Sequence, residues 1–365
     1  RGSSPVAMSL KLLFLCKRRP MGRDLLTRPY GRFYYLPLEL ARLGHQVEVI
    51  TFNYQHVPDE TYQSDGLRWH SISLATMPNR WWNNACDVAQ RYRPHWVIGC
   101  SDILYAIVAQ RLATRLRSRL AIDAYDNFEA YMPLAKPLHW WWRRVVAGAD
   151  LVTVAGPSLQ RLLGRQRPGR PPVIVPMAPD PTGFYAMDRF RARAQLGLDP
   201  TQRFVGYAGS IYRSRGIDQF FTAYELLQQQ LPDVAMLLSG RLERGIKLPR
   251  GAHYLGYVDD RLMPTVINSL EAMAVLNRPS SFGHYSYPIK LYEAMQCGVP
   301  VVASRTQSTA WILEQFPDML VEPNQPQMLA RALLDALALG RVDYGRLASW
   351  ADGARDYDVA LNALT

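Results

Sequence analysis

Hydrophobic and polar positions alternate in short blocks along the first half of the chain. Brief apolar runs, typical of buried strands, are separated by longer stretches in which apolar residues recur at helical spacing. The clearest helical stretches are Phe33–Leu43, which ends at Gly44, and Ile103–Leu116. Strands that alternate with helices predict a parallel, doubly wound α/β sheet. The predicted strands are Leu12–Leu15, Val47–Thr51, His95–Gly99, Leu120–Ala124, Leu151–Ala155 and Val173–Val175.

A proline-rich segment interrupts this pattern, and the alternation of strands and helices then begins again. The segment holds six prolines between Pro168 and Pro181, and the restart after it predicts a second α/β domain. The strands predicted there are Phe204–Ala208, Met236–Ser239, Tyr254–Leu255, Ala272–Leu276, Val299–Ala303 and Met319–Val321. The sequence thus predicts an N-terminal domain over 8–180, a C-terminal domain over 181–343 and a final helix within 344–365.

The composition is that of a globular protein with a strong positive charge. The 365 residues are 48% hydrophobic and 20% charged, and their formal net charge is +11, which favours an anionic partner such as a nucleotide diphosphate, a membrane surface or a nucleic acid. No apolar run approaches the roughly 20 residues of a membrane-spanning helix. Four scattered cysteines indicate reduced thiols in a cytoplasmic protein and no metal site. Residues 1–7 resemble a vector remnant.

The segment 286–304 combines a helix start with two charged side chains. Its sequence predicts a loop, a helix that begins near Pro288 and ends at Gly298, and a buried strand. Lys290 and Glu293 are three residues apart, so they share one face of that helix. The free N–H groups of a helix start attract phosphate, Lys290 adds a positive charge, and Glu293 can accept hydrogen bonds from both hydroxyls of a ribose. The segment therefore predicts a nucleotide site.

The same segment resembles the C-terminal signature of the retaining GT-B glycosyltransferases of family 4. Glu293 matches the second glutamate of that family's pattern of Glu, seven residues and Glu, and Tyr285 stands at the place of the first. The chain is similar to the variant that reads Ser-x-Pro-x-Lys-Leu-x-Glu. The resemblance implies an α/β fold of the GT-B type, in which two Rossmann-like, doubly wound domains face a central cleft and the last helix crosses back to the first domain.

The resemblance also assigns a donor site in the second domain. The loop after Phe204–Ala208 is similar to the family pattern of Gly-Arg, four residues and Lys-Gly, with Gly209 for the glycine, Ser210 for the arginine and Arg215 for the lysine. Cations at these positions hold the diphosphate of the donor, whose charge grows as it leaves, and Arg213 can supply the charge that Ser210 lacks. The other donor contacts predicted in this domain are Tyr257, Val258, His284, Tyr285, Ile289, Lys290, Leu291 and Glu293.

Two loops of the first domain are also predicted to contact the donor. Gly22 and Arg23 follow the first strand, where family members keep a glycine-bearing loop close to the donor phosphate, and Gly22 allows close approach of the backbone. Asp126 follows the strand Leu120–Ala124, where many members carry His-Asp and this chain has Tyr125 before the aspartate. We expect Asp126 either to contact the donor sugar or to cap the next helix.

Two stretches of the first domain are rich in tryptophan and arginine. Indole rings beside arginine suit the headgroup level of a membrane, and acceptors in the resembling family are often lipid-linked. The sequence therefore predicts either contact with the inner face of the membrane or packing in the core of the first domain. The residues concerned are Trp81, Trp82, Trp140, Trp141 and Trp142.

The leading interpretation is a retaining, metal-independent glycosyltransferase. It would move a sugar from a UDP- or GDP-linked donor to a glycan, a lipid-linked acceptor or a small molecule, with Asp126, Arg215 and Lys290 as catalytic residues and no cofactor. If the donor phosphate oxygen takes the acceptor proton, the absence of a carboxylate pair of the glycosidase kind is explained. Two alternatives stay open: an enzyme like UDP-N-acetylglucosamine 2-epimerase, and a non-catalytic basic module that binds membrane or nucleic acid. The charge is spread along the chain and no nucleic-acid motif appears, so we expect no nucleic-acid partner.

Overall fold

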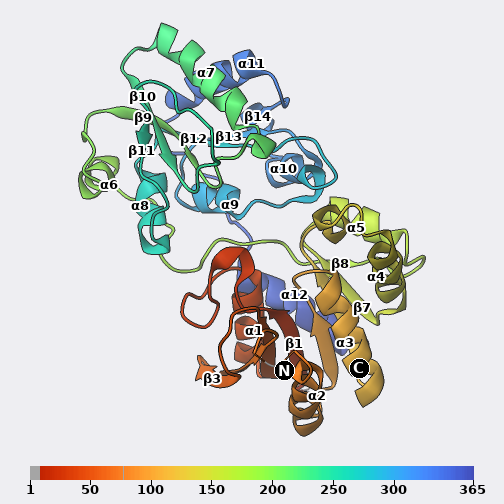
Figure 1. Ribbon diagram of the computed structural model, residues 1–365. Coiled ribbons are helices and arrows are strands. Elements are labelled where there is room, and N and C mark those ends of the chain that lie inside the picture. Colours follow the sequence, from red (N-terminus) through yellow and green to blue (C-terminus); the bar gives the residue numbers. More distant parts are fainter. Residues whose placement is uncertain (1–8, 77) are drawn as a thin grey trace, which may run out of the picture. The chain divides into compact units, whose positions relative to one another are not determined.

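The computed structural model describes residues 9–76 and 78–365, which form two compact units (Figure 1). The first unit contains the described residues up to Met177 together with Ala348–Thr365, and the second contains Ala178–Leu347. The predicted vector remnant at 1–7 lies outside the described residues. Each unit has a mainly parallel sheet with helices between its strands, as the alternating pattern of the sequence predicts.

The first unit is built on an eight-stranded sheet with the order β3-β4-β2-β1-β5-β6-β7-β8. All neighbouring strands are parallel except β3 and β4. The chain moves from β1 to one side of the sheet and later to the other, so right-handed crossovers place helices on both faces. The strands are β1 (Lys11–Lys17), β2 (Gln46–Asn53), β3 (Glu60–Ser64), β4 (Leu67–Ser73), β5 (Trp96–Gly99), β6 (Arg119–Ala124), β7 (Leu151–Val154) and β8 (Val173–Ile174).

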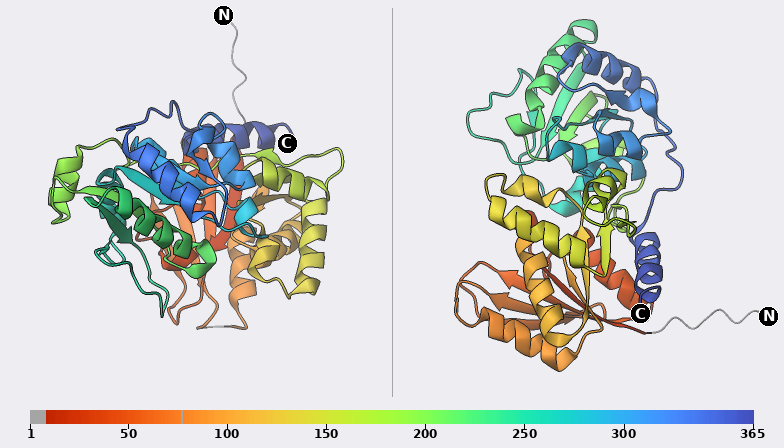
Figure 2. Two further views of the ribbon diagram at one scale, coloured as in Figure 1. Left: turned by 90° about the horizontal axis from the view of Figure 1, so that it is seen from above. Right: turned by 90° about the vertical axis from the view of Figure 1, so that its right-hand side faces the viewer.

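In the described part of the first unit, six α-helices accompany this sheet. Helices α3 and α4 pack against each other, and α3 also packs against β5 and β6 (Figure 2). A buried ion pair holds the start of α1, because the guanidinium of Arg32 contacts both carboxylate oxygens of Asp123 at 2.7 and 2.8 Å. The helices are α1 (Arg32–Arg42), α2 (Trp81–Tyr92), α3 (Ile103–Leu116), α4 (Lys136–Gly148), α5 (Pro157–Gly164) and α12 (Trp350–Asn362).

The last helix, α12, belongs to the first unit although it follows the second in sequence. It packs against α1, where the ring of Trp350 stacks on Tyr35 and Asp358 contacts His45 at 2.9 Å. The helix begins later than the predicted range of 344–365 suggests. Ser349 and Asp352 form a capping box that starts it, and the residues before Ser349 are not helical.

The second unit contains a six-stranded parallel sheet with the order β11-β10-β9-β12-β13-β14. Its strands are β9 (Arg203–Ala208), β10 (Val234–Ser239), β11 (His253–Tyr254), β12 (Ala272–Val275), β13 (Val301–Ser304) and β14 (Leu320–Val321). Its helices are α6 (Arg189–Gln195), α7 (Ile217–Gln230), α8 (Met263–Asn268), α9 (Ile289–Gln296), α10 (Gln307–Ile312) and α11 (Pro326–Leu337).

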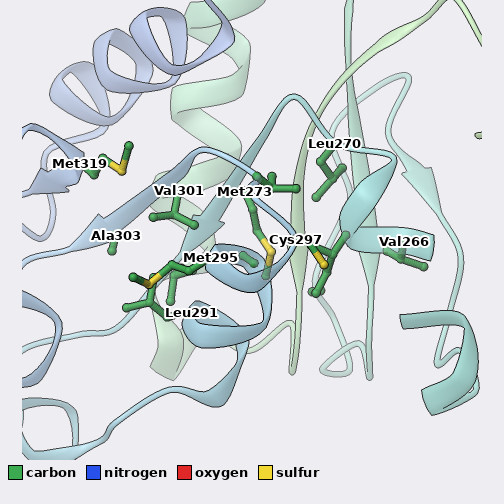
Figure 3. Packing of buried hydrophobic residues seen from close by; sticks show 14 of the residues in the cluster. Val266, Leu270, Met273, Leu291, Met295, Cys297, Val301, Ala303 and Met319 are labelled. Carbon is green, nitrogen blue, oxygen red and sulfur yellow. The ribbon is translucent and has the colours of Figure 1, made fainter. Parts of the chain in front are cut away.

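Successive residues of the central strands pack into two hydrophobic cores on opposite faces of this sheet. In β12, Met273 lies in the core that contains α8 and α9, whereas Ala272 and Ala274 lie in the core that contains α7 and α11. Figure 3 shows the first of these cores, in which Leu291 and Met295 of α9 lie near Val301 of β13. Full burial of one such side chain contributes roughly 1.5–3 kcal/mol to folding. This packing fixes α9 on the sheet.

Candidate active site

The polar residues of the second unit gather in the loops that follow its parallel strands. In a parallel sheet, every strand ends at the same edge and each following helix begins there. Helix α7 follows β9 after the short 3₁₀ turn η3 (Arg213–Arg215), and α9 follows β12. The N-termini of α7 and α9 therefore lie at the carboxyl edge of the sheet, which is where ligands of open α/β sheets bind.

Two glycines bring the loops after β9 and β10 into direct contact. The N–H of Gly209 donates to the carbonyl of Ser239 at 2.9 Å. A Cβ atom on Gly240 would lie only 1.7 Å from the carbonyl oxygen of Gly209. Gly240 also has φ 137°, which is strained for residues with a side chain. Only glycine fits at position 240, and the predicted site residue Gly209 owes its position to that contact.

Arg215 points toward the loop after β12. Its Nη1 donates to Oδ1 of buried Asn277 at 3.2 Å, and its guanidinium lies 4.8 Å from the ring centre of Phe282. Burial raises the pKa of Tyr207 to about 12, and the positive charge of Arg215 acts in the opposite direction. The structure thus places the Arg215 cation between the loops after β9 and β12, beside the start of α7.

Arg213 and Ser210 make contacts of a different kind. The guanidinium of Arg213 donates to the carbonyl of Gly245 at 2.9 Å and lies 3.9 Å from Oε1 of Glu243. Its backbone N–H donates to the other oxygen of Glu243 at 2.7 Å. Ser210 accepts a hydrogen bond from the Tyr207 hydroxyl through its carbonyl at 3.0 Å. Arg213 therefore joins the loops after β9 and β10, and its charge is already opposed by a carboxylate.

Helix α9 carries the Lys290 and Glu293 pair that the sequence singles out. Pro288 is the N-cap residue rather than a residue of the first turn, with φ −72° and ψ 116°. Nζ of Lys290 lies 2.7 Å from Oε2 of Glu293. The side chain of Glu293 is 1% exposed and that of Lys290 is 21% exposed. The helical spacing predicted that Lys290 and Glu293 share one face of the helix. In the structure they form an ion pair on that face, and the carboxylate of this pair is buried.

Some residues around this pair form the hydrogen bonds of a turn, and others pack in the hydrophobic core. The N–H groups of His284 and Tyr285 donate to Ser280 and Phe282 in the turn η5 (Gly283–Tyr285). Ile289 is half-buried at the start of α9. Leu291 was predicted as a donor contact, but its side chain is fully buried in the core and its N–H donates to the carbonyl of Pro288 at 3.0 Å. The structure therefore gives Leu291 a packing role, because the apolar face of α9 must cover the sheet.

Tyr257 and Val258 follow β11 in the loop that begins at Gly256. The guanidinium of Arg241 lies 5.3 Å from the ring centre of Tyr257, which is exposed. Val258 is partly buried and packs against the core on the α9 side of the sheet. The ring of Tyr257 is thus a flat exposed surface that a planar ligand could stack on.

Two functional candidates of this edge were missed from the sequence. Asn277 and Phe282, the partners of Arg215, both lie in the loop after β12. Asn277 follows that strand almost directly, and polar residues at the carboxyl end of a predicted parallel strand are candidates by position alone. Phe282 carries no such signal, because its contact with Arg215 depends on how the loop folds.

The predicted residues of the first unit lie in two loops at the carboxyl ends of its strands. Gly22 closes the turn η1 (Pro20–Gly22) with φ 79°, a conformation that favours glycine. The guanidinium of Arg23 lies 3.9 Å from the ring centre of Tyr30. Both residues therefore belong to an ordered loop after β1.

Asp126 lies in the loop after β6 and is 9% exposed. Its Oδ2 accepts a hydrogen bond from the Tyr131 hydroxyl at 2.8 Å. Burial and the nearby charge of Asp126 raise the pKa of both Tyr125 and Tyr131. The alternative of a helix cap does not hold, since Asn127 is the N-cap residue of the following turn η2 (Phe128–Tyr131). The Tyr131 hydroxyl thus lies between Asp126 and the Tyr125 hydroxyl, which is 3.3 Å from it.

The five tryptophans with a predicted membrane role lie in different surroundings. Trp142 is 1% exposed and packs on Phe128, so the prediction of membrane contact is wrong for this residue. Trp81 and Trp82 are half-buried in α2, and the ring of Trp81 packs on Phe52. Trp140 of α4 is 62% exposed, whereas Trp141 is half-buried and its indole N–H donates to Oε1 of Gln110 in α3 at 3.3 Å. No helix within residues 9–76 and 78–365 is long and apolar enough to cross a membrane.

Solved structures that share this architecture are glycosyltransferases of the GT-B type. Sucrose-phosphate synthase from Thermosynechococcus elongatus superimposes with a TM-score of 0.72 at 18% identity, over 97% of this chain and 94% of that one. HepE from Anabaena in complex with UDP superimposes with a TM-score of 0.69 at 17% identity, over 96% and 94% of the two chains. These likenesses show the fold, and the predicted GT-B class is confirmed.

Family models place the chain among the glycosyltransferases. The model described as Glycosyl transferases group 1 matches residues 202–338, and the model described as Glycosyl transferase 4-like domain matches residues 32–179. The chain belongs to this family of group 1, family 4-like glycosyltransferases, as its C-terminal signature predicted. A D-inositol 3-phosphate glycosyltransferase from Segniliparus rotundus is 28% identical over 179 residues, which cover 45% of this chain and 39% of the relative. The chain spans about two fifths to half of the length of such curated relatives.

Proposed function

We propose that the chain is a retaining, metal-independent glycosyltransferase that uses a nucleotide-diphosphate sugar, UDP- or GDP-linked, as donor. The observation that carries the proposal is the arrangement at the carboxyl edge of the second sheet. The Arg215 cation lies beside the start of α7, and the Lys290 and Glu293 pair occupies the first turns of α9. Two helix N-termini and two cations at one edge suit a diphosphate. UDP is the ligand of the HepE neighbour, so UDP is the first nucleotide to test.

The proposed reaction uses these cations to stabilise the leaving group. The bond between the anomeric carbon and the donor phosphate oxygen breaks, and the acceptor hydroxyl oxygen bonds to that carbon from the same face. The acceptor proton passes to the departing phosphate oxygen. Arg215 and Lys290 neutralise the negative charge that grows on the diphosphate, which is worth most in a site that excludes water.

Glu293 has two tasks in this proposal. One carboxylate oxygen holds the Lys290 ammonium, so Glu293 positions that cation toward the helix start. The other oxygen accepts hydrogen bonds from the ribose hydroxyls of the donor, which fixes the nucleotide. Asp126, whose carboxylate accepts a hydrogen bond from the Tyr131 hydroxyl, is the acidic side chain that we propose for contact with a sugar hydroxyl. The acceptor is a glycan, a lipid-linked sugar or a small molecule.

The test is release of the nucleotide diphosphate from a panel of donor sugars in the presence of EDTA. We expect Arg215→Ala to lower turnover by roughly 100-fold or more, the usual effect of removing one preorganised charge-stabilising group. Arg215→Lys should recover part of this loss, since it restores the charge without the planar fork. Arg250→Ala, at an exposed position of the same unit, is the matched control and should leave turnover unchanged. Complete loss of activity in EDTA, or full activity of Arg215→Ala, would contradict the proposal.

A further inference from the structure

We propose that the outer face of helices α3 and α4 docks the first unit on a membrane surface rich in anionic lipid headgroups. We call this surface the α3–α4 face. The inference does not depend on the proposed function, since it rests on the first unit alone. The residues that define the face are Arg111 and Arg115 of α3, Leu134 before α4, and Lys136, Trp140, Trp141 and Arg144 of α4.

Large apolar side chains are unusually exposed on the α3–α4 face. Leu134 is 92% exposed and Trp140 is 62% exposed. Both belong to the loop and helix that follow η2, and α4 lies side by side with α3 (Figures 1 and 2). Exposed leucine and tryptophan side chains gain free energy when they enter the boundary between headgroups and acyl chains, where an indole keeps its N–H in contact with water.

Cations surround these apolar residues in a regular way. Lys136, Trp140 and Arg144 are four residues apart, so they form one stripe along α4. The guanidinium of Arg144 lies 4.8 Å from the ring centre of Trp140. On the adjoining helix, the guanidinium of Arg111 lies 4.9 Å from the ring centre of Trp141. The exposed ring of Trp140 and the half-buried ring of Trp141 are therefore each paired with a positive charge.

Acidic residues are missing from both helices. The sequences of α3 (Ile103–Leu116) and α4 (Lys136–Gly148) contain neither aspartate nor glutamate. Glu129 reaches α4, where its carboxylate accepts hydrogen bonds from Arg143 at 2.7 and 2.8 Å. Arg143 lies beside the stripe and is not part of it. The charges of Lys136 and Arg144 thus stay available to headgroup phosphates.

This combination fits a lipid surface better than another occupant. Stable attachment to a membrane without a lipid anchor needs both an apolar and a basic contribution, and the α3–α4 face supplies both. Each basic residue near an anionic leaflet contributes about 1 kcal/mol. A nucleic acid would use the arginines but would leave Leu134 in water, whereas lipid buries it.

Cosedimentation of the full chain with vesicles tests the proposal. We expect binding to vesicles of equal parts phosphatidylcholine and phosphatidylglycerol, and much weaker binding to phosphatidylcholine alone. Arg111→Gln/Arg144→Gln should weaken the partition coefficient on the order of 30-fold, from about 1 kcal/mol for each charge. Trp140→Ala should weaken it several-fold, because it removes the largest inserted ring.

Matched controls separate this face from general attraction by the net charge of the chain. Arg250→Gln/Arg331→Gln removes the same charge from exposed positions of the second unit, and Met328→Ala removes an exposed apolar side chain there. Both should bind vesicles as the wild type does. Equal weakening by the control pair, equal binding to neutral vesicles, or no binding at all would overturn the proposal. So would a dimer that Trp140→Ala dissolves in the absence of vesicle binding, since it would assign the face to a second copy.

Discussion

Replacement of Lys290 by alanine should lower both the stability of the second unit and the turnover of the enzyme, and a second variant can tell these two effects apart. The side chain of Glu293 is 1% exposed, and Nζ of Lys290 lies 2.7 Å from its carboxylate. Truncation of Lys290 leaves this buried carboxylate without its cation. Breaking a fully buried pair costs about 3–5 kcal/mol. Because the Lys290 side chain is 21% exposed and water screens part of the interaction, we expect about 2–3 kcal/mol here, or roughly 30- to 150-fold in the unfolding equilibrium.

The double variant Lys290→Met/Glu293→Gln is the matched comparison. It removes both charges while it keeps most of the side-chain volume, and replacement of a whole buried pair is often nearly neutral for stability. We therefore expect it to recover most of the lost free energy of unfolding. It still lacks the ammonium group, so its turnover should remain as low as that of Lys290→Ala.

The chain contains two compact units, so a two-state treatment of its unfolding needs a probe confined to the second unit. Hydrogen exchange of peptides from α9 and β13 at increasing urea concentration measures that unit alone. A Lys290→Ala variant as stable as the wild type would refute the energetic role of the ion pair. Wild-type turnover in the double variant would refute the role of Lys290 at the diphosphate.

Two further predictions concern the loop after β9. Gly240→Ala should prevent correct folding of the second unit, because its Cβ would lie 1.7 Å from the carbonyl oxygen of Gly209. The control Gly251→Ala has φ 75° but open space around it, so it should cost only about 1 kcal/mol of stability. Similar urea midpoints of these two variants would contradict the clash. The pKa of Tyr207, raised by burial to about 12, lies above its ordinary value of 10.0. Between these two values the folded unit therefore keeps a proton that the unfolded chain loses. The contribution of Tyr207 to the free energy of unfolding should be complete below pH 10.0 and should be lost as the pH rises toward 12. Tyr207→Phe should reduce this fall in urea titrations, and an unchanged slope would show that the hydroxyl is not the cause.

The pattern of apolar residues along the chain explains why the central elements of both units could be predicted. Strands such as β12 are apolar at every position because both faces of the sheet are covered. The hairpin of β3 and β4 was missed because β3 is mostly exposed and carries no apolar pattern. Its turn did carry a signal, since Asp65 and Gly66 both have positive φ, at 51° and 81°, as a type I′ hairpin turn requires.

The boundaries of elements depended on contacts that are distant in sequence. The helix predicted from residue 344 begins only at Trp350, because Tyr344 is held in the second unit instead. Its hydroxyl accepts from the N–H of Val301 at 3.1 Å and donates to the carbonyl of Val299 at 3.0 Å. Strand β13 begins at Val301 rather than at Val299, since Pro300 lacks an N–H to donate.

The candidate site was predictable where local spacing decides the chemistry. Lys290 and Glu293 followed from helical spacing, and Arg215 from its place before a glycine and a helix. The pairing of Arg213 with Glu243, and of Arg215 with Asn277, joins loops that are 30 and 62 residues apart. No local pattern carries such information, because it depends on the strand order of the sheet.

Calorimetric titration with UDP, GDP, ADP and TDP in the presence of EDTA tests the central claim most directly. We expect selective binding of one nucleotide, weakened in Arg215→Ala and unchanged in Arg250→Ala. Such a result would locate the diphosphate at the carboxyl edge of the second sheet and define the donor class. Absence of binding by all four nucleotides, or equal affinity of the wild type and Arg215→Ala, would contradict the assignment of this edge as the donor site.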